Sequence, residues 1–418
     1  MSPPSRGKGG GMKRKRESDG EDKKRAKRSS KKDQNCSKKY LPMRRNSRAR
    51  YSQGRADTER PEKTGEKRKL EDEEMLTKKK KKPDEYREAM PSTSINPRGL
   101  SQFKIHQELA RGGFGIVYLA STTEKKTMVA IKAIAKKKQN ASLLTEKSVL
   151  LRSSGKPYLC QVYCGFQNDI YAFLAMEYLP GGDLEEVLEV EGALDVKTTV
   201  LCTAEILCGI QHLHKLGVIH RDIKAENILI DRRGHIRICD FGLAAENVFG
   251  IDMISGFCGT QTYMAPEILN EDYYDSAVDW WAFGVLLHHL MSNSFPFEEV
   301  DSAEEFREIV MSKEPTFPKN MTKEAKDIVA RILCKEKRRR LRWGVIIKHH
   351  PFYNDVSWEK VENQTIEPPF LHRLKSNIEV FSSPSLVLSS QQEPEGHTRP
   401  GVCKSISNFS FDLSECPI

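Results

Sequence analysis

The sequence predicts an α+β chain in which short strands come first, helices follow, and a charged arm precedes both. Three observations support this fold class. Strand-like runs cluster between residues 103 and 134, helical patterns dominate after residue 140, and residues 1–100 show no apolar periodicity. With 418 residues, the chain is long enough for two or three domains and a sizeable core.

Residues 1–100 carry all of the excess positive charge. They hold 32 Lys and Arg against 16 Asp and Glu, a net of +16, whereas the other 318 residues hold 36 against 42, a net of −6. This segment has only three aromatic residues, all of them Tyr, so it buries too little apolar surface to offset the entropy of the chain. We therefore predict a disordered basic arm over residues 1–100.

Basic clusters in the arm indicate its partners. The densest lie at Lys13–Arg16, Lys23–Lys32 and Lys78–Lys82. Such clusters bind nuclear import receptors, and they also bind nucleic acid or acidic surfaces. We favour nuclear import, with phosphate binding and a solvating tail without a fixed partner as alternatives. The expected location is the nucleus, the cytoplasm or both.

Composition also excludes two classes of protein. No run of 18 or more apolar residues exists, so no membrane span is expected. The ten cysteines have no regular spacing and no CxxC pair, and the N-terminus is charged where a secretory leader would be apolar. We expect reduced, intracellular thiols. Paired histidines such as His288 and His289 lack the spacing of zinc ligands, so zinc is not expected.

A glycine turn joins the first two predicted strands, Phe103–Ala110 and Gly115–Ser121. Glycines let backbone N–H groups approach a phosphate without interference from a Cβ atom. The evidence is weak by itself, because most glycine turns simply close hairpins. The turn is therefore a candidate phosphate-binding loop that needs support from other motifs.

The third predicted strand, Met128–Ile134, places Lys132 as a lone cation among apolar residues. A buried lysine needs an anionic partner, and Glu146 is the candidate. Glu146 belongs to a predicted helix at Leu143–Leu151, whose apolar positions leave it on a different face. The alternative for this pair is an ion pair on the surface.

The most specific motifs follow an amphipathic helix predicted at Lys197–Leu216. The segment VIHRDIKAENILI comes first, then the strand-like HIRIC, then DFG at Asp240–Gly242, and then APE at Ala265–Glu267. Together with VAIK at Val129–Lys132, and in this order, they resemble the signature motifs of protein kinases. Coincidence does not explain four motifs in this order and at the expected spacing.

The resemblance covers about residues 101–353 and implies a bilobal protein kinase fold, with a small, mainly β N-lobe and a larger, mainly α C-lobe. The stretches MEYLPGGDL, DFGLAAENVFG and FCGTQTYMAPE resemble the AGC group of serine/threonine kinases, and most closely the protein kinase C catalytic domain. Residues 354–418 resemble the AGC C-terminal extension, in which ISNFSF at Ile406–Phe411 would tuck onto the small lobe. The predicted parts are thus 1–100, 101–353 and 354–418.

The family chemistry is transfer of the γ-phosphate of ATP to a serine or threonine hydroxyl, with Mg²⁺ as cofactor. By resemblance, Asp222 would orient the substrate hydroxyl and accept its proton, and Lys224 would neutralise the moving phosphate. Asn227 and Asp240 would hold Mg²⁺. The nucleotide would contact Leu109, Ala110, Arg111, Gly112, Gly113, Phe114, Gly115, Ile116, Val117, Ala130, Lys132, Glu146, Met176, Glu177, Tyr178 and Leu229. Met176 is equally well explained as core filler.

Further roles implied by the resemblance are architectural. Glu267 should pair with Arg340. Asp279 should anchor the backbone of the catalytic loop, which is the segment that contains HRD at His220–Asp222. Asp183 and Glu226 match positions at which relatives bind arginines upstream of the phosphoacceptor, so protein substrates with basic residues near the Ser or Thr are expected.

Four positions depart from the family pattern. Ala110 replaces the first glycine of the nucleotide loop, so weaker ATP binding is expected. Gly256 stands where relatives phosphorylate a threonine, and Ala245 where they have a lysine that binds that phosphate. His289 replaces a further glutamate, which predicts looser selectivity. We therefore hypothesise a loop ordered without phosphorylation, or switched at Ser255.

Three functions follow from these patterns. An active serine/threonine kinase is favoured. A pseudokinase or nucleotide-binding scaffold is the second, because of Ala110 and Gly256. The third takes the basic arm as a nucleic-acid tether with a kinase attached.

Overall fold

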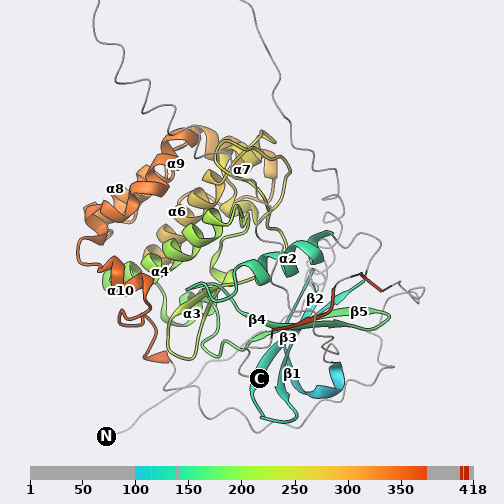
Figure 1. Cartoon of the computed structure of the whole chain (residues 1–418). Coiled ribbons are helices and arrows are strands. Elements are labelled where there is room, and N and C mark those ends of the chain that lie inside the picture. The colour runs from blue at the N-terminus through green and yellow to red at the C-terminus, as the bar shows by residue number, and fades with distance from the viewer. Residues whose placement is uncertain (1–98, 114, 137–140, 374–404, 408, 414–418) are drawn as a thin grey trace, which may run out of the picture. The chain divides into compact units, whose positions relative to one another are not determined.

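A computed structural model describes residues 99–113, 115–136, 141–373, 405–407 and 409–413 (Figure 1). The predicted arm lies outside these residues except for Gly99 and Leu100, and so does Phe114 of the glycine turn. Strands dominate the first part of the described chain and helices the later part. The predicted α+β arrangement is therefore confirmed.

The main sheet has six strands in the order β1-β2-β3-β5-β4-β8, and every neighbouring pair is antiparallel. The three strands predicted from sequence are present, and their observed ends extend the predicted ones by one or two residues. The strands are β1 (Phe103–Gly112), β2 (Gly115–Thr122), β3 (Met128–Ala135), β4 (Val162–Gln167), β5 (Tyr171–Glu177) and β8 (Phe411–Asp412).

The later part of the chain is helical, with one two-stranded sheet of β6 (Ile228–Ile230) and β7 (Ile236–Ile238). Short polar side chains accept hydrogen bonds from the first turns of α3, α4, α7 and α8, which fixes where these helices begin. The helices are α2 (Ala141–Arg152), α3 (Leu184–Glu191), α4 (Val196–Lys215), α5 (Pro266–Leu269), α6 (Ala277–Ser292), α7 (Ala303–Ser312), α8 (Lys323–Ile332), α9 (Lys337–Ile346) and α10 (Trp358–Glu362).

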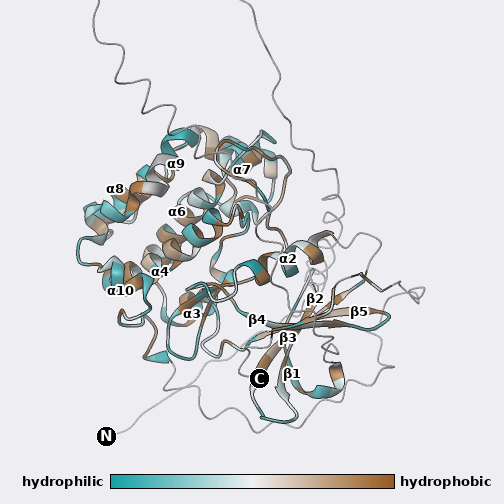
Figure 2. Cartoon of the chain, in the orientation of Figure 1, coloured by the Kyte–Doolittle hydropathy of each residue, from teal (hydrophilic) through white to brown (hydrophobic). Residues whose placement is uncertain are grey.

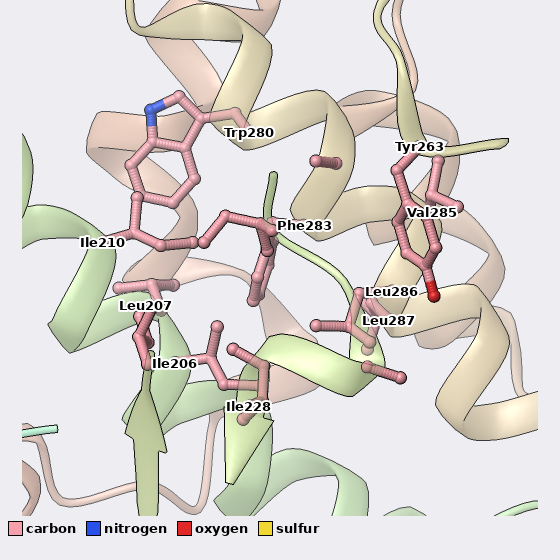
Figure 3. Close-up of a cluster of buried hydrophobic side chains, with 14 of the residues drawn as sticks. Ile206, Leu207, Ile210, Ile228, Tyr263, Trp280, Phe283, Val285, Leu286 and Leu287 are labelled. Carbon is pink, nitrogen blue, oxygen red and sulfur yellow. The ribbon is translucent and has the colours of Figure 1, made fainter. Parts of the chain in front are cut away.

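Helix α6 is the centre of the helical core. Its residues from Ala277 to Met291 are all buried, as expected for a helix that is apolar on every side. Figure 3 shows Leu207 and Ile210 of α4 beside Phe283 of α6. By contrast, α8 carries both hydrophilic and hydrophobic residues (Figure 2) and buries one face only. No helix within the described ranges is long and apolar enough to cross a membrane.

The C-terminal segment extends the main sheet, as the ISNFSF motif predicted. Strand β8 pairs with β4, with Gly165 opposite Phe411. Phe409 is fully buried, and the ammonium of Lys147 in α2 lies over the rings of Phe409 and Phe411. The tail therefore holds α2 and the sheet edge together.

The predicted pair of Glu267 and Arg340 is present and buried. The Arg340 guanidinium also donates to the carbonyl oxygens of Ala277 (2.9 Å) and Cys334 (2.8 Å). One side chain thus joins α5, the start of α6 and the segment before α9. Its loss would leave a buried carboxylate and two carbonyl groups without their donor.

Arg340→Ala is expected to lower the free energy of unfolding by about 3–5 kcal/mol, because it breaks a buried ion pair. Arg339→Ala is the control, since Arg339 is exposed and pairs only with the exposed Glu336 among the contacts of the described chain. That change should cost less than about 1 kcal/mol. Denaturant unfolding of both variants measures the difference, and equal effects would contradict this role for Arg340.

Candidate active site

Lys132 lies at the centre of a buried ionic group. Its ammonium donates to Oε1 of Glu146 (2.6 Å) and to Oδ1 of Asp240 (2.9 Å), and its side chain is only 7% exposed. The pairing with Glu146 is confirmed, and the surface alternative is wrong. The predicted face is also wrong, because Glu146 shares the buried face of α2 with Leu143 and Leu150 at helical spacing.

The electrostatics of this group keep Lys132 charged. Burial alone would lower the pKa of Lys132, but the carboxylates of Glu146 and Asp240 outweigh it and raise that pKa. Burial would likewise raise the pKa of Asp240, and the attraction of Lys132 outweighs it and lowers that pKa. The site therefore presents a fixed cation beside an ionised carboxylate at neutral pH.

Asp279 holds the backbone of the catalytic loop, as predicted. Its fully buried carboxylate accepts from the N–H groups of His220 and Arg221, both at 2.9 Å, and from Nε2 of His214 at 2.8 Å. Burial would raise the pKa of Asp279, but the hydrogen bond from His214 outweighs it and lowers the pKa. The ionised Asp279 carboxylate therefore fixes the backbone of the two residues that precede Asp222.

Asp222 lies in a polar cluster that orients its carboxylate. Oδ1 accepts from both the N–H (3.0 Å) and the hydroxyl (2.8 Å) of Thr260, and Oδ2 accepts from Nδ2 of Asn227 (3.1 Å). The ammonium of Lys224 is 3.7 Å from Oδ2 and donates to the Thr260 hydroxyl at 2.9 Å. The structure thus brings together the predicted base and the predicted phosphate-neutralising lysine.

Asn227 and Asp240 fit the predicted Mg²⁺ site. The N–H of Cys239 donates to the Asn227 carbonyl (2.9 Å), which brings the residue before Asp240 next to Asn227. In the described part of the chain, Asn227 donates through its side-chain nitrogen to the carbonyl oxygen and to Oδ2 of Asp222, which leaves its amide oxygen available as a metal ligand. Two hard oxygen donors suit Mg²⁺ that also binds phosphate oxygens. No group of three or more His, Cys, Asp or Glu suited to a metal occurs among the described residues.

The glycine turn is a hairpin between β1 and β2, with Gly112 opposite Gly115 and Ala110 opposite Val117. Gly115 has a positive φ of 133°, and a Cβ there would clash with the carbonyl oxygen of Ala133. No such constraint acts at Gly112 or Gly113, which have open space around the Cβ position. Arg111 is exposed and pairs with Glu108 at 2.6 Å.

The residues predicted to surround adenine lie on adjacent strands. Ala130 on β3 is opposite Met176 on β5, and Val117 on β2 is opposite Lys132. Leu229 belongs to β6 in the helical part of the chain. The N–H of Glu177 donates to the Gln161 carbonyl (3.0 Å), so this backbone donor is already used within the protein and is not available to bind the nucleotide. The remaining predicted residues have these positions: Leu109 and Ala110 are exposed on β1, Ile116 is half-buried on β2, and Tyr178 follows β5.

The loop that contains Gly256 is held by neutral groups. Arg221 donates to the carbonyl of Leu243 (2.7 Å) and to the hydroxyl of Tyr274 (3.2 Å), and that hydroxyl donates to the Gly256 carbonyl (3.0 Å). A Cβ at Gly256 would lie 4.0 Å from the Arg221 guanidinium. A phosphorylated side chain at this position would thus meet Arg221, and here Tyr274 does so instead.

Carboxylates gather around the predicted peptide-binding positions. Glu226 is 44% exposed at the side chain, whereas Asp183 is half-buried and accepts from the Glu186 N–H at the start of α3. Burial and repulsion by Glu226 and Asp183 raise the pKa of Glu185. Burial lowers the pKa of His289 to about 4, so His289 is neutral at physiological pH and does not repel a basic peptide.

Sequence reasoning missed Glu185 and Tyr274. Glu185 lies two residues after Asp183 in the run GGDLEE, but the repulsion that raises its pKa also depends on Glu226, which lies 41 positions later. Tyr274 lies in DYYDS, where nothing distinguishes it from Tyr273. Its burial and its contact with Arg221 are tertiary features that no local pattern encodes.

Comparisons with known proteins agree with the motifs. A family model described as protein kinase domain matches residues 103–353. Human protein kinase C delta type is 39% identical over 282 residues, which are 66% of this chain and 42% of that protein. Rabbit protein kinase C epsilon type is 36% identical over 295 residues (68% and 40%), and a protein kinase C-like protein of Hypocrea jecorina is 34% identical over 310 residues (70% and 27%). The chain thus covers about two fifths or less of these relatives.

Tyr274→Phe is expected to loosen the Gly256 loop, because it removes the hydroxyl that joins Arg221 to the loop backbone. Chymotrypsin should then cleave after the exposed Phe249 or Phe257 about tenfold faster or more, as local opening becomes easier. Tyr273→Phe is the matched control, since Tyr273 is exposed. Mass spectrometry of the fragments locates the cleavage, and equal rates in the two variants would contradict the role of Tyr274.

Proposed function

This chain belongs to the protein kinase family, and we propose that it is an ATP- and Mg²⁺-dependent serine/threonine kinase that phosphorylates protein substrates with a basophilic preference. One observation carries the proposal. The ammonium of Lys132 is held between Glu146 and Asp240, and the Asp222 carboxylate is oriented by Thr260 and Asn227. These are the groups that phosphoryl transfer needs in place before substrate binds.

The chemistry follows from the position of each group. Lys132 would bind the α- and β-phosphates, since Glu146 keeps its ammonium fixed. Asp222 would orient the substrate hydroxyl and accept its proton. Lys224, between Asp222 and Thr260, would neutralise charge on the transferred phosphoryl group. Asn227 and Asp240 would hold Mg²⁺, which when bound neutralises the charge of the phosphates.

The serine/threonine assignment rests on Lys224 and Thr260. The Thr260 hydroxyl contacts both Lys224 and Asp222, so a threonine of the loop completes the site beside the substrate hydroxyl. Similarity to protein kinase C relatives supports the same specificity class. Ala110 is the feature that favours a scaffold without catalysis, but it lies on the exposed part of β1 and displaces none of the charged groups.

The basophilic preference rests on Glu226, Glu185 and Asp183. Their mutual repulsion is relieved when an arginine side chain binds among them, so a substrate with upstream arginines gains affinity. His289 carries no charge at neutral pH. Selectivity therefore depends on the three carboxylates.

The basic arm belongs to the proposal as well. Its net charge of +16 and its lysine clusters favour contact with a nuclear import receptor or with nucleic acid. We accordingly propose the nucleus, the cytoplasm or both as the site of action.

The deciding experiment measures transfer of labelled γ-phosphate from ATP and Mg²⁺ to an array of Ser, Thr and Tyr peptides. Labelling of serine or threonine peptides is expected, and Asp222→Asn should lower it at least a hundredfold, because the base is lost. Both proteins are first shown to unfold at similar temperatures. If the unmodified protein labels peptides no more strongly than Asp222→Asn does, the result would favour the hypothesis of a nucleotide-binding scaffold without catalysis.

Glu226→Gln is expected to lower kcat/KM about tenfold for a serine peptide with arginines two and three residues upstream, which corresponds to ~1.4 kcal/mol. A peptide with alanine in place of the arginines should respond little. Glu324→Gln is the control, since Glu324 is exposed in the first turn of α8 and is not one of the three carboxylates. Equal loss on both peptides would show that Glu226 does not read arginine.

A further inference from the structure

Cys160 and Cys239 occupy opposite positions in a short parallel backbone pairing, which ends directly before Asp240 in the sequence. The N–H of Ile238 donates to the Tyr158 carbonyl (2.9 Å), and the N–H of Cys160 donates to the Ile238 carbonyl (3.0 Å), so Leu159 and Ile238 are bridge partners. The next residues on the two segments are Cys160 and Cys239. Residues paired in this way project their side chains to the same face.

The two thiols are neighbours. The Cys160 thiol donates to the Gln161 carbonyl (3.9 Å) and the Cys239 thiol to the Arg237 carbonyl (3.5 Å). Interaction with the Cys239 thiol, together with burial, raises the pKa of Cys160 well above its usual value. Both cysteines are reduced in this structure. Cys160 is 4% exposed, whereas Cys239 is half-buried, so an oxidant in solution reaches Cys239 first.

The backbone spacing suits a disulfide. Paired strands lie about 4.8 Å apart, and disulfides join Cα atoms that are about 4.4–6.8 Å apart. The two sulfur atoms would have to approach to about 2.05 Å. To form the bond, both side chains turn toward each other and the backbone of both segments moves with them.

We propose that Cys160 and Cys239 are a redox modification site, at which a peroxide converts the two thiols to a reversible disulfide. Cys239 first reacts with hydrogen peroxide to give a sulfenic acid and one water. The Cys160 sulfur then displaces the second water and forms the S–S bond. Overall the two thiols lose two electrons and two protons, and the peroxide is reduced to two waters.

The position of this pair predicts its effect. Cys239 directly precedes Asp240, whose carboxylate lies 2.9 Å from the Lys132 ammonium. Cys160 directly precedes Gln161, whose N–H donates to the Glu177 carboxylate at the end of β5 (2.8 Å). Closing the disulfide pulls on both segments at once. Since a misplacement of about 1 Å costs about a hundredfold in rate, a smaller displacement of Asp240 is expected to lower the catalytic rate at least tenfold.

The experiment uses the full chain, treated with hydrogen peroxide or with dithiothreitol, blocked with a thiol reagent and digested for mass spectrometry. A peptide pair joined through Cys160 and Cys239, two hydrogens lighter than its reduced parts and absent after dithiothreitol, is expected. It should disappear in Cys160→Ala and in Cys239→Ala. Cys334→Ala should retain it, since Cys334 is also half-buried but lies elsewhere.

Binding of a fluorescent ATP analogue and peptide phosphorylation are then compared for oxidised and re-reduced protein. The phosphorylation readout rests on the proposed kinase function, whereas detection of the linked peptide does not. If the kinase proposal fails, phosphorylation is absent but the linked peptide still forms. If the disulfide proposal fails, the linked peptide is absent but phosphorylation remains. The expected result is an activity loss of at least tenfold that dithiothreitol reverses and that Cys160→Ala escapes. Thermal unfolding shows that each reduced variant is folded.

Two results would overturn the disulfide itself, and a third would overturn its predicted effect on activity. The first is that both thiols remain available to the blocking reagent after peroxide. The second is that Cys239 is oxidised to a sulfinic acid while Cys160 stays a thiol, which means that the pair does not close. The third is that the linked peptide forms but nucleotide affinity and activity are unchanged, which removes the regulatory part.

Discussion

The charge of Lys132 is the constraint on which the rest of the site depends. An ammonium buried in a β-sheet is tolerated only if carboxylates neutralise it. Here they come from 14 and from 108 residues further along the chain, at Glu146 and Asp240. Helix α2 and the segment after β7 must therefore lie against β3, and the position of three separate elements follows from one charge.

Buried carboxylates in the helical part of the chain extend the same principle to the loops. Asp279 of α6 fixes the catalytic loop through two backbone N–H groups. Glu205 of α4 accepts from the His235 ring (2.6 Å) and from the Ile236 N–H (2.9 Å), which fixes the start of β7. Since β7 leads directly to Asp240, the helices α4 and α6 determine where the site residues lie. The packing of α4 and α6 therefore sets the geometry of the site.

Sequence patterns predicted what depends on spacing along one element or on a motif of fixed order. The strand that carries Lys132 and the helix α4 are examples of the first, and the anchoring role of Asp279, implied by the resemblance to kinases, is an example of the second. The predicted face of Glu146 is wrong because the helix buries Val149, whereas Leu144, which is also apolar, is 43% exposed. The contact of Cys160 with Cys239 and the relay through Tyr274 depend on register between distant segments, which no local pattern contains.

The two substitutions in the Gly256 loop make physical sense only together. Ala245 is 6% exposed, so a lysine there would bury an ammonium, and Gly256 provides no phosphate to repay its desolvation. It would also add a second cation close to Arg221. With both groups absent, the Tyr274 hydroxyl and two backbone carbonyls satisfy Arg221, and these neutral acceptors are permanent. We therefore propose that folding itself orders this loop without phosphorylation, the alternative being a switch at Ser255.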